Sequence, residues 1–162
     1  MRAVVRHCST DRDYAGLTRF YINHTRDFDR SYSLQDGLFH ILTTLNDFQF
    51  ITYHNAQEHL IGFVQYRTEE EKGTVFVDAA ILEEKYRSTS VFYYGLQDLI
   101  KYILENNKEV KSMYFFAAAD NLYVNRLYRK FARLVDVTQR RGRTENVYAA
   151  DLQGLLHDLR VY

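Results

Sequence analysis

The stretch TVFVDAAILEEKYRSTSVF (residues 74–92) combines a strand, a short charged loop and the start of a helix. Its first nine residues are mostly apolar or β-branched, which is typical of a strand. Apolar residues then recur at helical spacing from about Ser90 to Asn106. A loop between a strand and a helix can bind an anion, because unpaired N–H groups and the helix dipole favour negative charge. Arg87 adds a cation there, although hydroxyl residues before a helix are more often simple caps.

The residues before this stretch predict one strand, two helices and two more strands. A strand over 2–8 precedes helices over about 11–24 and 34–45, which have hydroxyl or acidic residues at their starts. Residues 48–53 and 59–67 are rich in β-branched and aromatic side chains, and short polar links join them to each other and to 74–82. These consecutive strands predict an antiparallel meander.

The residues after the stretch complete the pattern. Residues 112–118 are almost continuously apolar, which favours a strand buried on both faces in a parallel pairing. A helix over about 121–132, a hairpin of 135–138 with 145–150 and a short helix over 151–159 follow. The order β-α-α-β-β-β-α-β-α-β-β predicts the α/β class (a mixed α+β arrangement), with a single mixed twisted sheet flanked by helices. No linker divides residues 1–162, so we expect one domain.

Composition excludes several classes of function. Lys and Arg total 21, as do Asp and Glu, so no net charge attracts nucleic acid non-specifically. Apolar runs are too short for a membrane span, and we expect a cytoplasmic protein. The single cysteine, Cys8, can form neither an internal disulfide nor a cysteine-based metal site. His24, His40 and His54 lack the spacing of metal ligands, so no metal site is predicted.

Three motifs in order resemble the GNAT superfamily of acyl-CoA N-acyltransferases. Residues 87–92, Arg-Ser-Thr-Ser-Val-Phe, are similar to its pyrophosphate-loop pattern Arg/Gln-x-x-Gly-x-Gly/Ala. Residues 60–64 with 75–82 resemble the central hairpin of that superfamily. Residues 121–132 resemble its Asn-x-x-Ala-x-x-Leu-Tyr-x-x-x-Gly helix. The similarity covers about 59–137, and the element order extends it to the whole chain.

The resemblance implies acetyl-CoA as cosubstrate and assigns roles to particular residues. Arg87, with the backbone of Ser88, Thr89, Ser90, Val91 and Phe92, would hold the pyrophosphate. Ile81 and Leu82 would pair with the pantetheine arm and place the thioester carbonyl. Asn121 would bond the cofactor, and Tyr128 would protonate the departing thiolate. The implied reaction moves an acetyl or other acyl group to a primary amine of a small molecule or peptide, by direct attack in a ternary complex.

The loop departs from the family pattern at both glycines. Ser90 and Phe92 replace them, and the benzyl group of Phe92 could occupy the space of the pyrophosphate. Glu84 stands where the family has proline, and Ala132-Arg133 stands where it has Gly-Phe. A catalytically inactive GNAT-fold binding module is therefore the alternative prediction.

Other residues have two interpretations each. Asp78 is a candidate base for the amine or a group that orients it, with Glu83 and Glu84 as substitutes, but Asp78 could also face solvent. Tyr128 could be a core residue instead of an acid. A basic turn contains three arginines, and we expect it to be a solvated hairpin tip rather than a nucleic-acid contact. The sequence leaves open a homodimer formed through surface strands.

Overall fold

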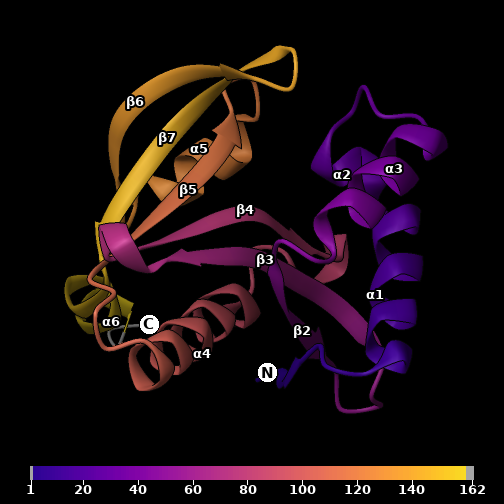
Figure 1. Cartoon of the computed structure of the whole chain (residues 1–162), viewed down its shortest axis with the longest axis horizontal. Coiled ribbons are helices and arrows are strands. Elements are labelled where there is room, and N and C mark those ends of the chain that lie inside the picture. Colours follow the sequence, from indigo (N-terminus) through magenta and orange to yellow (C-terminus); the bar gives the residue numbers. More distant parts are fainter. Residues whose placement is uncertain (1, 160–162) are drawn as a thin grey trace. The chain divides into compact units, whose positions relative to one another are not determined.

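The computed structural model describes residues 2–159 and contains every helix and strand that the sequence predicts (Figure 1). Its elements are β1 (Val4–His7), α1 (Asp11–Asn23), α2 (Thr25–Phe28), α3 (Leu34–Thr44), β2 (Gln49–His54), β3 (Leu60–Glu69), η1 (Glu70–Lys72), β4 (Thr74–Leu82), η2 (Glu84–Tyr86), α4 (Ser90–Asn106), β5 (Ser112–Ala118), α5 (Leu122–Tyr128), β6 (Arg133–Arg140), β7 (Arg143–Asp151) and α6 (Leu152–Leu159).

The strands form one mixed sheet in the order β1-β2-β3-β4-β5-β7-β6. The predicted α/β class with a mixed sheet is thus confirmed. The chain forms two compact units. One contains the residues up to Arg67 together with Ala79–Asp98, and the other contains Thr68–Asp78 together with the residues from Leu99 onward.

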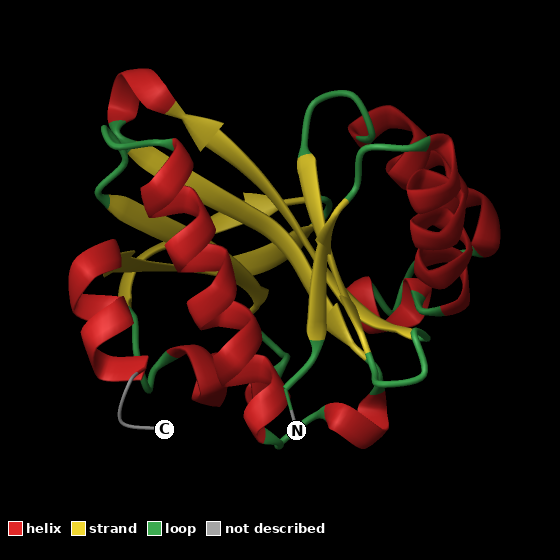
Figure 2. Ribbon diagram, turned by 90° about the horizontal axis from the view of Figure 1, so that it is seen from below, coloured by secondary structure: helices red, strands yellow, loops and turns green. Residues whose placement is uncertain are grey.

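The first unit packs two capped helices against an antiparallel ladder. β2 pairs with β3 in the antiparallel arrangement predicted for the meander, and β1 adds an antiparallel pairing with β2 that the sequence did not predict. Helices α1 and α3 lie side by side (Figure 2). Each begins with a capping box, formed by Thr10 with Asp13 and by Ser33 with Asp36, which satisfies N–H groups that a helix start leaves unpaired. The fully buried side chains of its core include Leu17, Tyr21, Ile41, Ile51 and Phe63.

Helix α2 lies between the two predicted helices, in a segment for which the sequence predicts no helix. The Thr25 hydroxyl donates to the carbonyl of Tyr21 at 3.1 Å, which links the start of α2 to the end of α1. Gly37 of α3 lies against Thr25, and a Cβ at position 37 would come within 2.6 Å of that side chain. Tertiary packing therefore forms this four-residue helix, which lacks the apolar periodicity of a longer one.

The second unit is built on a ladder of one parallel and two antiparallel pairings. β4 and β5 run parallel, with register from Thr74 opposite Ser112 to Val77 opposite Phe115. β5 then pairs with β7, and β7 with β6, both antiparallel. The parallel partner predicted for residues 112–118 is confirmed. Burial of β5 alternates between full and partial, however, so only one face is fully buried.

Two boundaries of this unit differ from the prediction. Helix α5 ends at Tyr128, and residues 129–132 form turns in which the N–H groups of Phe131 and Ala132 both donate to the Tyr128 carbonyl. β6 is longer than the predicted 135–138 and contains a register shift between Leu134 and Asp136.

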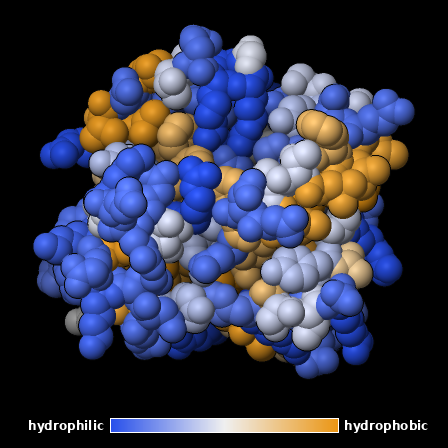
Figure 3. All heavy atoms as spheres, in the orientation of Figure 1, coloured by the Kyte–Doolittle hydropathy of each residue, from blue (hydrophilic) through white to orange (hydrophobic). Residues whose placement is uncertain are grey.

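Apolar side chains are exposed on α3 and on β6 (Figure 3). They are Leu34, Leu38, Phe39 and Leu42 on α3, and Leu134, Val135 and Val137 on β6. None of the helices within residues 2–159 is both long enough and apolar enough to cross a membrane.

Candidate active site

The loop after β4 is fixed by backbone hydrogen bonds. The N–H of Glu83 donates to the carbonyl of Ile61 at 2.8 Å, and the η2 turn closes with the N–H of Arg87 donating to the carbonyl of Glu84 at 3.0 Å. Ser88 then adopts the left-handed region, with φ of 60°. The conformation that favours glycine therefore falls at Ser88, not at Ser90 or Phe92, where the family has its glycines.

Arg87 holds this loop in place through two side-chain contacts. Its Nε donates to the carbonyl of Leu82 at 2.8 Å, and its Nη2 forms an ion pair with Asp27 Oδ2 at 2.9 Å. Both side chains are about one-third exposed, at 32% and 37%. The guanidinium thus joins the end of β4 to helix α2 before any ligand binds.

The N-terminus of α4 has the features of an anion site. The helix begins at Ser90 and has no acidic residue in its first turn, so the helix itself brings no negative charge to this end. The Thr89 hydroxyl donates to the carbonyl of Tyr86 at 2.5 Å and accepts from the N–H of Val91 at 3.3 Å. Phe92 lies within the first helical turn, is half-buried, and packs edge-to-face against Tyr93.

The end of β4 lies very close to β3. A Cβ on Gly62 would come within 2.7 Å of the Ile81 carbonyl oxygen and 3.0 Å of the Leu82 side chain. Ile81 is buried and Leu82 is half-buried. Only glycine at position 62 permits this approach, which positions the segment predicted to contact the pantetheine arm.

A cavity of about 580 Å³ opens directly after β4. Its lining consists of polar and ionisable side chains, namely His24, Asp27, Glu83, Glu84, Lys85 and Arg87. Lys85 Nζ lies 3.3 Å from Glu83 Oε2, and this hydrogen bond and charge raise the pKa of Lys85. Carboxylates outnumber the cations, so the cavity suits a positively charged group.

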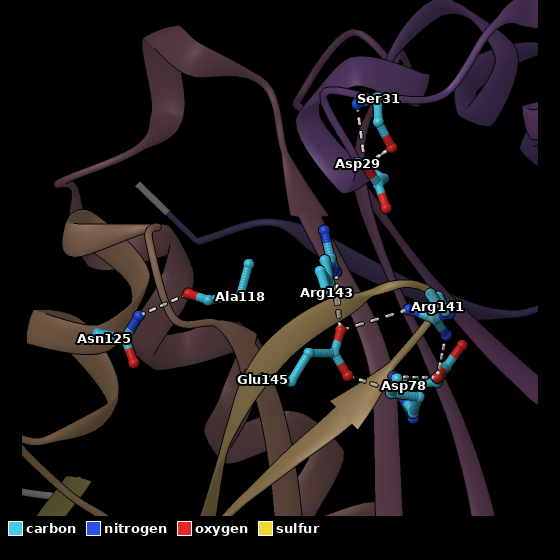
Figure 4. Close-up of polar contacts among 9 residues, drawn as sticks. Asp29, Ser31, Asp78, Ala118, Asn125, Arg141, Arg143 and Glu145 are labelled. Carbon is cyan, nitrogen blue, oxygen red and sulfur yellow. Dashed lines mark hydrogen bonds and ion pairs between the residues drawn. The ribbon is translucent and has the colours of Figure 1, made fainter.

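Asp78 is buried and ion-paired in the second unit (Figure 4). Its Oδ1 accepts hydrogen bonds from Arg140 Nη2 at 2.9 Å and from Arg141 Nη2 at 2.5 Å. The interpretation that Asp78 faces solvent is therefore wrong, since only 6% of the residue is exposed. Because two guanidinium groups share this oxygen, the carboxylate orients the hairpin in the structure.

The arginines of the β6–β7 turn converge on a second buried carboxylate. Glu145, whose side chain is 1% exposed, accepts from Arg140 Nε at 2.6 Å and from Arg143 Nη2 at 2.9 Å. The Arg140 guanidinium also stacks on the Phe116 ring, with 4.2 Å between its carbon and the ring centroid. The prediction of a solvated hairpin tip is wrong, because buried carboxylates and an aromatic ring hold these arginines.

Asn121 and Asn125 anchor helix α5 in different ways. Asn121 is the N-cap, and its side chain accepts from the N–H of Val124 at 3.2 Å. Asn125 is buried, and its amide nitrogen donates to the carbonyls of Ala118 and Asn121, each at 2.8 Å. Its oxygen accepts from Asn146 and from the Tyr148 hydroxyl, each at 2.7 Å. The Asn125–Ala118 bond joins α5 to the end of β5 (Figure 4).

Tyr128 is buried within an aromatic cluster. Its ring packs against Phe115, Phe131 and Tyr148, with centroids 5.1, 5.9 and 5.7 Å away. Burial raises the pKa of its phenol. The hydroxyl forms no hydrogen bond with any residue between Arg2 and Leu159. This position fits both interpretations, core residue and acid.

Sequence reasoning missed Asn125, Glu145 and His24. Asn125 has only the signal of a polar residue on the apolar side of a helix, and Glu145 is a charge inside an apolar strand. His24 was placed at the end of a helix and given no role. Among residues 2–159, no group of three or more His, Cys, Asp or Glu side chains could hold a metal ion.

The chain has the fold of the GNAT acetyltransferases, as its likeness to solved structures shows. No family model and no curated protein sequence matches the chain. Among solved structures, the spermidine N-acetyltransferase of Vibrio cholerae, with CoA and spermine, has a TM-score of 0.71 and 13% identity, covering 95% of this chain and 98% of that one. The predicted resemblance in fold is thus confirmed.

Two other neighbours have comparable scores. RimL, the ribosomal L7/L12 alpha-N-protein acetyltransferase in complex with coenzyme A, has a TM-score of 0.67 and 12% identity, covering 93% of this chain and 95% of that chain. The PaiA N-acetyltransferase of Thermoplasma acidophilum, in complex with coenzyme A, has a TM-score of 0.66 and 14% identity, covering 93% and 99%. At these identities the likeness establishes the fold alone.

Proposed function

We propose that this chain is an N-acetyltransferase that moves an acetyl group from acetyl-CoA to a primary amine by direct attack in a ternary complex. The proposal rests on a single observation, the conformation of the connection between β4 and α4. The end of β4 lies against Gly62 and continues into a loop that Arg87 holds in place. This loop leads into helix α4, which has no acidic residue in its first turn. That geometry suits a pyrophosphate bound by backbone N–H groups.

In this proposal, each residue of the site has a separate role. The backbone of residues 88–92 holds the pyrophosphate, and Arg87 keeps the loop in place through Leu82 and Asp27. Ile81 and Leu82 lie along the pantetheine arm, and Asn121 bonds the cosubstrate. Tyr128 donates its proton to the departing sulfur, a role that suits a phenol because burial keeps it protonated.

The acceptor amine is best sought in two classes. The neighbour from Vibrio cholerae is a spermidine N-acetyltransferase, and RimL acts on a protein α-amino group. The acid-rich cavity after β4 favours an amine that arrives as a cation. Spermidine and a short peptide with a free N-terminus are therefore the first two acceptors to test.

The proposal is tested first by binding and then by turnover. Acetyl-CoA at one hundred times its dissociation constant stabilises a protein by about 2.7 kcal/mol, which raises Tm by several degrees. We expect such a rise with both acetyl-CoA and CoA, followed by release of free thiol when an amine is added. No change in Tm with either compound would overturn the proposal.

The inactive binding module is the second candidate. Phe92 on the first turn of α4 and the ion pair of Arg87 with Asp27 favour it, since both reduce what the loop offers a phosphate. Acetyl-CoA binding without acetylation of any amine tested would support this module.

A further inference from the structure

His24 is held in one orientation at the junction of α1 and α2. Its backbone N–H donates to the carbonyls of Phe20 and Tyr21, each at 3.1 Å, and caps α1. Its ring stacks on the Phe20 ring, with centroids 4.0 Å apart and planes 20° apart. Phe20 is itself only 7% exposed. The imidazole therefore has little freedom to turn.

The hydrogen bond of this ring selects its tautomer. Nδ1 lies 2.8 Å from the Phe20 carbonyl oxygen, which can only accept. Nδ1 therefore carries the proton, and Nε2 of the neutral ring has an open lone pair. No residue between Arg2 and Leu159 forms a hydrogen bond with Nε2.

His24 lines the cavity that opens after β4. The facing groups are Asp27 of α2, Glu83, Glu84 and Lys85 at η2, and Arg87. Asp27 is ion-paired with Arg87 at 2.9 Å and Glu83 with Lys85 at 3.3 Å. Glu84 is exposed to solvent. Two of the three carboxylates are thus engaged with cations and the third is exposed, whereas His24 is a half-buried base whose orientation is fixed by Phe20.

We propose that His24 is the base that takes a proton from the acceptor amine, an inference that rests on the proposed acetyltransferase function. An amine is mostly an ammonium ion near neutral pH, so it must lose a proton before its lone pair can attack. A neutral imidazole with a free lone pair on Nε2 can accept this proton. The cavity begins at the residue after Leu82, the segment assigned to the thioester.

The proton transfers balance as follows. A bond forms between His24 Nε2 and one ammonium proton as that N–H bond breaks. The freed lone pair forms a C–N bond with the acyl carbon, and the C–S bond breaks with its electron pair on sulfur. Tyr128 gives its proton to sulfur, forming the thiol, and recovers a proton as the second ammonium proton leaves nitrogen, while the third stays on the amide. His24 then releases its proton to solvent.

The histidine at position 59 provides a matched control. His59 is exposed in the turn between β2 and β3, in the same compact unit as His24. His54 is less suitable, because both of its ring nitrogens have partners, the Glu58 carbonyl and the Thr52 hydroxyl. We therefore compare wild type with His24→Gln and His59→Gln.

The kinetic test measures acetylation of spermidine and of the peptide from pH 6 to 9. We expect His24→Gln to lower kcat by at least about 100-fold, with KM for acetyl-CoA within twofold, because only proton transfer is lost. The residual rate of the His24→Gln variant should increase with pH, because the solvent then removes the ammonium proton of the acceptor. His59→Gln should match wild type. A His24→Gln variant with kcat within threefold of wild type would overturn the inference.

A second measurement does not depend on turnover. Long-range ¹H–¹⁵N NMR of the wild-type protein distinguishes the two nitrogens of each imidazole. We expect His24 to carry its neutral-state proton on Nδ1, and we expect millimolar spermidine to shift its Nε2 signal while His59 stays unchanged. Should wild type acetylate neither amine, this titration still shows separately whether His24 contacts an amine through Nε2. A proton on Nε2, or a His24 signal that spermidine leaves unmoved, contradicts the role.

Discussion

Asp78 and Glu145 are held by the same guanidinium group, that of Arg140, at 2.9 Å and 2.6 Å respectively. The two carboxylates come from different strands, β4 and β7, and both are almost fully buried. A buried charge is costly unless it is paired, so each of these groups depends on the others.

We expect Glu145→Gln to destabilise the protein by about 3 kcal/mol, because it leaves three arginines without their shared carboxylate. The value is at the low end for a buried pair, since the arginine side chains are 16–25% exposed. Chemical denaturation measures the change. Glu58→Gln is the control, because its ion pair with Arg6 is exposed and should contribute less than about 1 kcal/mol. Equal losses in the two variants would contradict the structure.

Asn125→Ala should cost about 3 kcal/mol, since it leaves buried donors and acceptors unsatisfied at Ala118, Asn146 and Tyr148. Asn125→Asp should be similarly harmful, because a carboxylate cannot donate to the two carbonyls. Thermal unfolding tests both. Asn46→Ala, at an exposed turn, should change stability by less than about 0.5 kcal/mol.

Gly62→Ala should destabilise by about 1–3 kcal/mol and weaken acetyl-CoA binding, because the new methyl group collides with the Ile81 carbonyl. Gly16→Ala makes the same change in helix α1, where no atom lies within 4 Å of the added Cβ. That variant should gain about 0.5–1 kcal/mol. A stable Gly62→Ala protein would show that β3 and β4 are not in such close contact.

Tyr128→Phe should lower kcat about 100-fold and leave stability within about 0.5 kcal/mol, because the aromatic packing stays and the hydroxyl has no partner among residues 2–159. Burial raises the pKa of Tyr128 above its ordinary 10.0, so the phenol should stay protonated and active through pH 9. Steady-state kinetics across pH tests this.

Tyr148→Phe should have the opposite effects, lowering stability and leaving kcat unchanged. Its hydroxyl donates to Asn125 at 2.7 Å, so its removal should cost about 1 kcal/mol without lowering kcat. A Tyr128→Phe variant with wild-type kcat would assign Tyr128 to the core alone.

Cys8 should react slowly with thiol reagents in the native protein. Burial, with a smaller effect of Asp13, raises the pKa of its thiol to about 12, so little thiolate is present at pH 8. The folded state therefore holds this proton more tightly than the unfolded state. Its contribution to stability is complete below the ordinary pKa of 9.0 and declines as the pH increases toward about 12.

Ellman's reagent measures the rate, which should increase sharply in guanidinium chloride. Cys8→Ser should show a smaller loss of stability between pH 9 and pH 12 than wild type. Equal rates in native and unfolded protein would contradict the burial of Cys8.

The periodicity of apolar residues and the order of the predicted helices and strands were sufficient to predict the fold. The apolar spacing from Ser90 to Asn106 and the β-branched and aromatic residues of 48–53 and 59–67 depend on local chemistry, and the structure has those elements. Helix α2 was missed because Thr25 forms it through packing on Gly37, a contact that no local pattern encodes.

The polar networks could not be predicted in the same way. Asp78 and Arg141 lie 63 positions apart, and only the pairings of β4, β5 and β7 bring them together. Residues 87–92 were identifiable as a candidate loop, whose role stays a prediction, because their chemistry is contiguous. The partners of Arg87 were not, since Asp27 belongs to a helix that the sequence did not reveal.

The register shift between Leu134 and Asp136 has a consequence for the outermost strand, β6. A strand at the edge of a sheet can recruit a strand from another molecule, and the exposed Leu134, Val135 and Val137 would favour such growth. A bulge interrupts the even row of N–H and C=O groups that a newcomer must match. This irregularity therefore disfavours pairing of β6 with a strand from another molecule.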